Sequence, residues 1–138
     1  VYGAWAVASA LTPALLPVAA AIGRRLTARG HCEGVVVKHR ARGAAAQRSD
    51  VLAEIVGQAP PERLVVREGP WRFEVHLTAG VNVGLFGDMR LERLRLAGIA
   101  AERRVLNLFA YTGSLSVACA TGGAAHVTSV DLSEGVLA

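Results

Sequence analysis

The chain has 138 residues, which suits one domain, or one small domain followed by part of another. Its apolar content of 52% excludes an intrinsically disordered chain. The two cysteines, Cys32 and Cys119, lie far apart, and neither belongs to a CxxC pair. The sequence therefore predicts no metal site and no disulfide framework, and a reduced, cytoplasmic setting is expected.

The formal net charge is +4, the pI is near 9.8, and nearly all the cations are arginine. Arginine binds phosphate through its planar fork, so the charge is consistent with a nucleic-acid partner. An arginine-rich and alanine-rich composition explains the charge equally well. On charge alone, both interpretations stay open.

The first 23 residues carry no charge, which is long enough for a membrane span. However, Pro13 and Pro17 interrupt the run, and the weakly hydrophobic alanine dominates it. The positive charges follow the run instead of preceding it, which is not typical of a signal peptide. We therefore expect no membrane segment here.

The front half predicts short strands around one helix. Tyr2–Ala8 has the pattern of a strand, and a helix is expected from Thr12, its N-cap, to about Arg29, with Gly30 ending it. The β-branched stretch Gly34–Lys38 predicts another strand. The basic stretch 39–48 predicts an exposed loop, which suits phosphate contact but more commonly is only solvated.

A hairpin is predicted next. Arg63–Arg67 is expected to be a strand, and Glu68-Gly69-Pro70 turns the chain. The following residues alternate strictly, as in a half-buried antiparallel strand. The apolar face holds Trp71, Phe73, Val75 and Leu77, and the polar face holds Arg72, Glu74 and His76. We expect His76 to face solvent and not to bind a ligand.

The pattern changes after Gly80. Asp88 is expected to cap a helix from Met89 to about Ile99, with Leu91, Leu94 and Ile99 facing inward.

A strand–helix–strand unit follows that helix. The expected strands are Arg103–Leu108, apolar on both faces, and Ala125–Val130; the expected helix is Ser114–Thr121, stopped by Gly122-Gly123. Such a βαβ crossover implies a parallel sheet. Ser133 is expected to cap a further helix.

This unit has the geometry of a nucleoside-binding site. Ligands of open parallel sheets lie beyond the carboxyl ends of the strands, where Gly113 permits close approach and Asp131 follows the second strand. Asp131 stands 18 residues after Gly113, near the spacing of an acid that accepts ribose hydroxyls. The single glycine disfavours a pyrophosphate-binding nicotinamide cofactor. A βαβ unit without a ligand remains an alternative.

Two stretches make a family resemblance specific: FEVHLTAGVNVGLFGDMRLERL (Phe73–Leu94) and VLNLFAYTGSLSVACATGGAAHVTSVDLS (Val105–Ser133). They resemble bacterial 23S ribosomal RNA large-subunit methyltransferases, which include guanine-N7 and cytosine-C5 enzymes. Val75-His76-Leu77-Thr78 and Gly84-Leu85-Phe86 are closest to the guanine-N7 branch. The resemblance covers residues 73–138 well and is weaker upstream.

The resemblance implies an α/β fold: the start of a Rossmann-like class I methyltransferase sheet, preceded by a small α+β domain. We place the small domain, with its hairpin and an expected RNA contact, at residues 1–80. The catalytic domain is then 81–138, and we expect it to be truncated and inactive by itself. S-adenosylmethionine is the implied cofactor.

The resemblance also implies roles for individual residues. The loop around the methionine and ribose portions of the cofactor would comprise Asn107, Phe109, Tyr111, Thr112, Gly113 and Ser114. Asp131 would hold the ribose hydroxyls. Phe86, Asp88 and Arg90 would flank the cofactor, with Arg90 suited to its carboxylate, although Asp88 and Arg90 equally suit a helix cap and a helix surface. Val83 and Gly87 depart from the family pattern of threonine and leucine.

The implied reaction transfers a methyl group to a base of 23S ribosomal RNA, with guanine N7 favoured over cytosine C5. Attack at C5 needs a cysteine nucleophile, and neither cysteine is placed for that role. We assign no catalytic residue. Two alternatives are a nicotinamide-dependent enzyme and a non-catalytic RNA-binding module using Arg24, Arg25, Lys38, Arg40 and Arg42. Nothing in the sequence indicates an oligomeric state.

Overall fold

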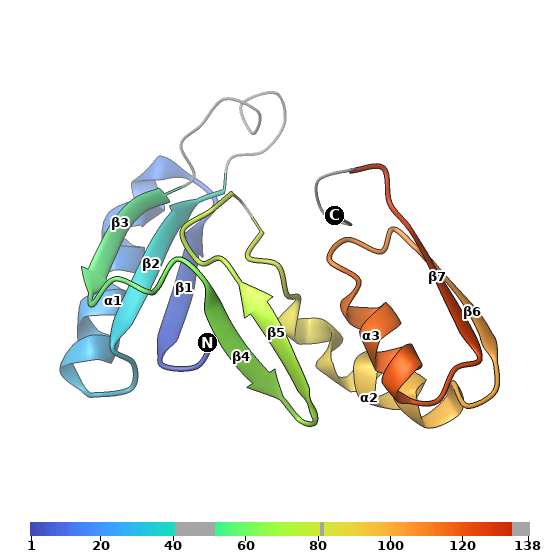
Figure 1. Ribbon diagram of the computed structural model, residues 1–138. Coiled ribbons are helices and arrows are strands. Elements are labelled where there is room, and N and C mark those ends of the chain that lie inside the picture. The colour runs from blue at the N-terminus through green and yellow to red at the C-terminus, as the bar shows by residue number, and fades with distance from the viewer. Residues whose placement is uncertain (41–51, 81, 134–138) are drawn as a thin grey trace. The chain divides into compact units, whose positions relative to one another are not determined.

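The computed structural model describes residues 1–40, 52–80 and 82–133. The chain forms two compact units, labelled here unit 1 (1–66 and 74–83) and unit 2 (67–73 and 84–138). Figure 1 shows their helices and strands. The predicted domain boundary at residue 80 stays a prediction, and residues 67–73, which it assigns to the front domain, belong to unit 2.

Unit 1 is built on a three-stranded sheet in the order β1 (Trp5–Ala10), β2 (Gly34–His39) and β3 (Leu52–Gly57). Strand β1 runs parallel to β2 and is joined to it by α1 (Leu16–Ala28), while β3 is antiparallel to β2. The short helix η1 (Pro13–Leu15) precedes α1. Both predicted strands and the helix exist, but β1 begins and ends later than expected.

Two details of this unit differ from the sequence expectations. Thr12 precedes η1 with proline behind it, but its side chain makes no capping hydrogen bond. The sequence does not predict strand β3, because apolar and polar residues do not alternate in LAEIVG, and in the structure only Val56 of its six residues is buried. Of the expected loop at 39–48, His39 ends β2, and residues 41–48 lie outside the described residues.

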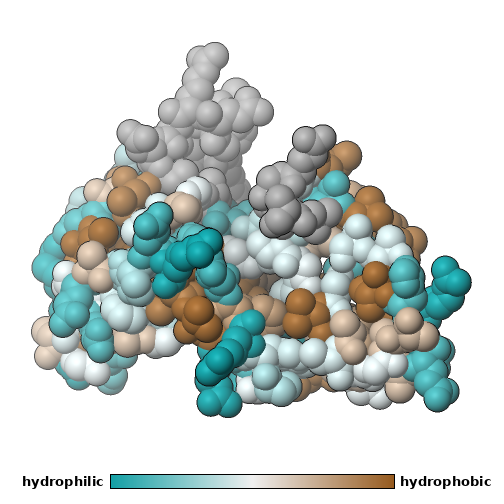
Figure 2. All heavy atoms as spheres, viewed as in Figure 1, coloured by the Kyte–Doolittle hydropathy of each residue, from teal (hydrophilic) through white to brown (hydrophobic). Residues whose placement is uncertain are grey.

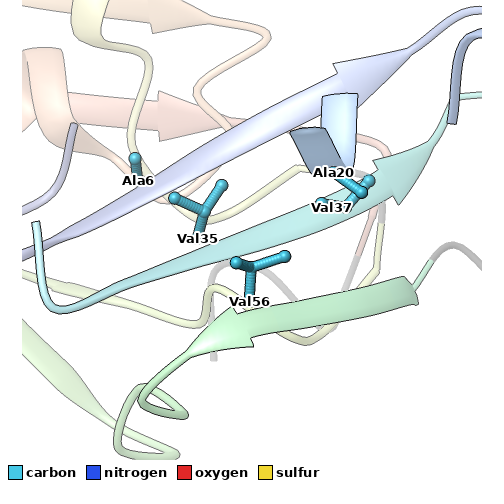
Figure 3. Packing of buried hydrophobic residues seen from close by; sticks show 5 residues of the cluster. All are labelled: Ala6, Ala20, Val35, Val37 and Val56. Carbon is cyan, nitrogen blue, oxygen red and sulfur yellow. The ribbon is translucent and has the colours of Figure 1, made fainter. Parts of the chain in front are cut away.

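Helix α1 covers one face of this sheet, and Figure 3 shows five of the buried residues packed between them. Ala20 on the helix packs with Ala6, Val35, Val37 and Val56 from the three strands, and all are at most 7% exposed. Such small residues let the helix lie close to the strands. A Cβ at Gly23 would stand 3.3 Å from Cβ of Val35. The core of unit 1 therefore depends on shape as well as on apolar area.

The opposite face of β2 carries Lys38, the only lysine in the chain. Lys38 is 1% exposed, and its Nζ donates hydrogen bonds of 2.9 Å to the carbonyl oxygens of Ala79 and Gly80. Desolvation by burial lowers the pKa of this amine. The segment after the hairpin is therefore fixed over this face of the sheet by a buried cation.

The hairpin consists of β4 (Leu64–Glu68) and β5 (Trp71–Val75). The predicted alternation is confirmed, since Trp71, Val75 and Leu77 are buried and Arg72 and Glu74 are exposed. On the polar face His76 is half-exposed and its Nε2 lies 3.0 Å from Oε1 of Glu74. Its placement on that face is also as predicted.

Unit 2 contains η3 (Gly87–Met89), α2 (Arg90–Ile99), β6 (Arg104–Leu108), α3 (Ser114–Thr121) and β7 (His126–Val130). Strands β6 and β7 pair in parallel from Arg104 opposite His126 to Leu108 opposite Val130. The predicted βαβ unit is therefore confirmed almost to the residue. The helix expected after Ser133 lies outside the described residues.

Helix α2 corrects two predictions. Asp88 lies inside η3 and makes no side-chain cap, because the chain enters α2 through a 3-10 turn whose last residue, Met89, is the N-cap. The expected inward residues Leu91, Leu94 and Ile99 are 74%, 46% and 55% exposed, whereas Arg93 is fully buried. The hydrophobic stripe misleads here because the face that packs inward meets a carboxylate, Glu68, which an arginine satisfies.

One face of the β6–β7 pair is likewise open among the described residues. Leu106, Leu108 and Val130 are 62%, 56% and 47% exposed, while Val105 and Asn107 on the other face are partly covered. Figure 2 shows apolar side chains interspersed with polar ones on the surface. No helix in the described ranges combines the length and hydropathy needed to cross a membrane.

Helix α2 and the end of α3 approach through a glycine. A Cβ added to Gly122 would lie 2.2 Å from the carbonyl oxygen and 2.7 Å from the Cα of Ala97. Both neighbours are backbone atoms, which do not move as a flexible side chain does. Glycine at this position is therefore required by packing.

We expect Gly122→Ala to lower the free energy of unfolding by roughly 1–3 kcal/mol, the usual cost of overpacking. The matched control is Gly98→Ala on α2, where a Cβ meets nothing within 4 Å. There alanine is expected to raise stability by about 0.5–1 kcal/mol, because glycine is a poor helix former. Urea unfolding of both variants checks this, and equal effects would contradict it.

Candidate functional site

The loop between β6 and α3 has an unusual backbone. Phe109 and Tyr111 have φ angles of 56° and 50°, and Gly113 has 74°. For the two aromatic residues this left-handed conformation costs about 1–3 kcal/mol each. Such strain persists only where surrounding contacts fix it, and it is concentrated at ligand sites. Apart from Gly113, no residue type in this loop indicates such strain.

Hydrogen bonds that the loop donates to the end of β7 hold this loop in place. The N–H of Ala110 donates to the carbonyl oxygen of Val130 over 3.0 Å, and the N–H of Tyr111 donates to Oδ2 of Asp131 over 2.8 Å. The loop is closed internally by the N–H of Gly113, which donates to the carbonyl oxygen of Ala110 over 2.9 Å. The strained loop thus depends on the neighbouring parallel strand.

Asp131 is the charged group of this edge. Its Oδ1 accepts the N–H of Ser133 over 3.0 Å, and its Oδ2 accepts that of Tyr111. These hydrogen bonds lower the pKa of Asp131 below its ordinary value of 3.8, and the bond from Ser133 contributes most. Each carboxylate oxygen has a second lone pair, so the group can accept further donors such as a pair of hydroxyls.

Gly113 leaves space at the start of α3. It is the N-cap residue of that helix, and a Cβ built on it would meet nothing within 4 Å. The first N–H groups of a helix have no partner within the helix and favour acceptor groups of a ligand. Backbone approach from this side is therefore unobstructed by a side chain.

Two contacts join the loop to the segment before α2. The hydroxyl of Thr112 donates to the carbonyl oxygen of Gly84 over 2.6 Å. The rings of Tyr111 and Phe86 are tilted by 50°, with their centroids 5.3 Å apart. The structure thereby brings together Phe86 and the loop residues that the sequence had placed in one site.

The other predicted site residues lie in unit 2 as well, in different settings. Asp88 and Arg90 are exposed, on η3 and at the first residue of α2. Asn107 instead lies on β6, where its amide nitrogen donates to Oγ of Ser116 over 2.8 Å, and that hydroxyl is 2.7 Å from Oγ of Ser129. Asn107 thus links both strands to α3, below the loop. Phe109 is 83% exposed.

Arg93, which the sequence does not mark as a site residue, donates hydrogen bonds to Ser114 and Phe86 from beneath the site. Its only signal was an arginine on an amphipathic helix, which more often faces solvent. The described residues hold no group of three histidine, cysteine, aspartate or glutamate side chains arranged for a metal ion.

The basic residues named for an RNA-binding module differ in how accessible they are. Lys38 is wrong for that role, because it is buried and both printed hydrogen bonds of its Nζ go to backbone carbonyls. Arg24 lies 3.5 Å from Oε1 of Glu54. Arg25 and Arg40 are exposed, and Arg42 lies outside the described residues.

Comparison with known proteins identifies the family to which the chain belongs. Residues 16–138 match the family described as S-adenosylmethionine-dependent methyltransferase. The chain belongs to the S-adenosylmethionine-dependent methyltransferase family. The cofactor and the Rossmann-like class I fold expected from the sequence are thereby confirmed.

One relative and two solved structures are informative. "Ribosomal RNA large subunit methyltransferase K/L" of Magnetococcus marinus is 43% identical over 105 residues, 76% of this chain and 14% of its own length. A Streptococcus mutans protein described as a SAM-dependent methyltransferase superposes with a TM-score of 0.81 and 32% identity, over 99% of this chain and 35% of its own. A methyltransferase solved in complex with SAH gives a TM-score of 0.80 and 32% identity, with coverages of 99% and 34%.

The chain therefore spans only a small part of these relatives. The match to Magnetococcus marinus is with a ribosomal RNA methyltransferase, so the resemblance read from the sequence is confirmed at the level of the family. The choice between guanine N7 and cytosine C5 does not follow from these similarities.

We expect Asp131→Asn to lower the free energy of unfolding at about pH 6, where the wild-type carboxylate is ionised. Because the folded-state pKa is depressed, this stabilisation is present above the ordinary value of 3.8 and is lost as pH falls through the folded-state pKa. The difference between variant and wild type should therefore shrink in acid.

Urea unfolding at about pH 6 and about pH 3 measures this difference. Asp88→Asn is the control, because its carboxylate is exposed and has no hydrogen bond among the described residues; at about pH 6 it should change stability by less than about 0.5 kcal/mol. A difference for Asp131→Asn that stays constant with pH would contradict the role of its ionised form.

Proposed function

We propose that the protein carrying this chain transfers a methyl group from S-adenosylmethionine to a base of large-subunit ribosomal RNA. The Asp131 carboxylate beside the strained loop supports this proposal most directly. We propose that the cofactor contacts unit 2 through the residues named from the sequence: Phe86, Asp88, Arg90, Asn107, Phe109, Tyr111, Thr112, Gly113, Ser114 and Asp131. Asn107 would act through the strand and helix that it links.

The local geometry fits an adenosine-containing ligand. Asp131 has acceptor capacity left after its two backbone bonds, which suits the two ribose hydroxyls. Gly113 leaves the start of α3 open to close approach. Arg90 is exposed and carries a fork that matches a carboxylate, such as that of the methionine portion.

Catalysis by such a site is mainly positioning. When bound, S-adenosylmethionine supplies a methyl group on a positively charged sulfur, so no side chain has to activate it. The loop and Asp131 would orient the nucleoside end, and fixing two reactants in line lowers the barrier by removing motional freedom. The target base has to leave its stack to reach the methyl group.

Guanine N7 is the target that we favour, because Val75-His76-Leu77-Thr78 and Gly84-Leu85-Phe86 are closest to the guanine-N7 branch. The N7 lone pair attacks directly, whereas methylation at cytosine C5 needs a cysteine nucleophile. Cys119 is 3% exposed inside α3, and burial raises the pKa of its thiol, which disfavours the nucleophilic thiolate. Cys32 belongs to unit 1 and packs against its core.

We expect S-adenosylmethionine to bind the full-length natural protein that contains this chain. The substitution Asp131→Ala should weaken this binding by roughly tenfold or more, because charge-assisted hydrogen bonds are lost. Isothermal calorimetry measures both affinities, with thermal unfolding alongside.

The control is Glu102→Asn, which removes an exposed carboxylate at the amino end of β6 and suits the left-handed φ of 61° there. It should bind as wild type does. Wild-type protein that binds no cofactor would overturn the proposed function.

The base is tested by incubating the same polypeptide with large-subunit ribosomal RNA and isotopically labelled cofactor, followed by nucleoside mass spectrometry. We expect the label in 7-methylguanosine. Label in 5-methylcytidine would overturn the base assignment alone, and label in no ribosomal nucleoside would overturn the RNA substrate. Asp131→Ala protein provides the background.

A further inference from the structure

Among the described residues, the largest fully buried side chain carries a charge. Arg93 on α2 is 0% exposed, and burying a guanidinium is costly unless it is paired. Its Nε and Nη2 each donate to one carboxylate oxygen of Glu68, both over 2.6 Å. This is the parallel two-bond geometry in which arginine and carboxylate bind most specifically. The pair therefore has a fixed orientation.

The other donors of the same guanidinium point toward the candidate cofactor site. Nη2 donates to the carbonyl oxygen of Phe86 over 3.0 Å, and Nη1 donates to Oγ of Ser114 over 3.4 Å. The ring of Phe73 lies 5.5 Å from Cζ, a favourable distance for a cation above an aromatic face. One planar group thus joins four segments of unit 2.

Two of these segments flank the strained loop. Phe86 carries the ring that rests on Tyr111, and Ser114 is the first residue of α3, directly after Gly113. The planar, rigid guanidinium thus hydrogen-bonds both of these residues at once. Lysine is a single flexible donor group and cannot reproduce that geometry.

We propose that Arg93 is a positioning residue of the cofactor site: pinned by Glu68, it sets the distance between Phe86 and the start of α3. This rests on the proposed function, because it presumes that S-adenosylmethionine binds at this loop. Arg93 would not touch the cofactor itself, and it would act on the cofactor only through these two residues. The alternative is a brace that supports the fold and leaves cofactor affinity unchanged.

A second brace in unit 2 separates these alternatives. Nε1 of Trp71 donates to Oγ1 of Thr121 over 2.7 Å, which links the same hairpin to the last residue of α3. Its loss should destabilise unit 2 at the end of α3 remote from the loop. It is therefore the matched control for a purely structural effect.

The experiment compares Arg93→Lys, Thr121→Val and Arg95→Lys in the longest natural polypeptide that contains the chain. Arg95 is on the same helix, in an exposed ion pair with Glu92. For each protein, S-adenosylmethionine affinity is measured by calorimetry and the unfolding midpoint by circular dichroism. Arg93→Lys should weaken binding by roughly tenfold, and neither control should change it.

A double variant keeps the test decisive if Arg93→Lys does not fold. Replacing both charges, as Glu68→Met with Arg93→Met, leaves no unpaired buried ion, and such replacements commonly retain stability. Methionine also packs well against the ring of Phe73. We expect this double variant to unfold near the wild-type midpoint and to bind the cofactor more weakly than wild type does.

The outcomes separate the two proposals. Wild-type affinity in a folded Arg93→Lys or double variant overturns the positioning role and leaves the proposed function intact. If Thr121→Val loses as much affinity as Arg93→Lys does, the role of Arg93 is only to support the fold. Wild-type protein that binds no S-adenosylmethionine overturns the proposed function and this inference together.

Discussion

The hydrogen bond from the Tyr111 N–H to the Asp131 carboxylate is the contact on which the candidate site depends. It joins a loop after β6 to the end of β7, and it can form only because these strands are parallel and in register. Without this hydrogen bond, little would hold Phe109 and Tyr111 in their left-handed conformations. The same carboxylate is the group that we propose accepts the ribose hydroxyls, so one side chain would both hold the loop and bind the ligand.

Beneath this loop the protein uses charge where a hydrophobic residue is the usual choice. Arg93 and Glu68 satisfy each other in the interior of unit 2, and the arginine's other bonds reach Phe86 and Ser114. A buried ion pair adds little stability compared with well-packed apolar residues. Its advantage is direction, because a guanidinium fixes several partners at set angles. That advantage suits the positioning role that we propose for Arg93.

Unit 1 shows a similar use of a buried cation. Lys38 fixes the chain after the hairpin through two carbonyl oxygens, so a residue that suggested RNA contact serves the fold. The exposed cations Arg25 and Arg40 remain on the surface of that unit. Net positive charge therefore says little about an RNA surface until the buried and paired cations are subtracted.

The sequence by itself determined what depends on neighbouring residues. The β6–α3–β7 unit, its stop at Gly122-Gly123 and the alternation of β5 were predicted almost to the residue, because period, caps and glycines act within a few positions. The family followed from the long ordered motif around Gly113 and Asp131. The site residues named from that motif remain a prediction, although Phe86 and Tyr111 were found in contact.

Only the tertiary structure decided which face of α2 is buried, that Lys38 is internal, and that β3 joins the first sheet. Each depends on a partner far along the chain: Glu68 lies 25 residues before Arg93, and Ala79 lies 41 residues after Lys38. Helical period places Leu91 and Leu94 on one stripe but cannot say what that stripe will meet. The strain at Phe109 and Tyr111 likewise comes from bonds to the neighbouring strand, which no local pattern encodes.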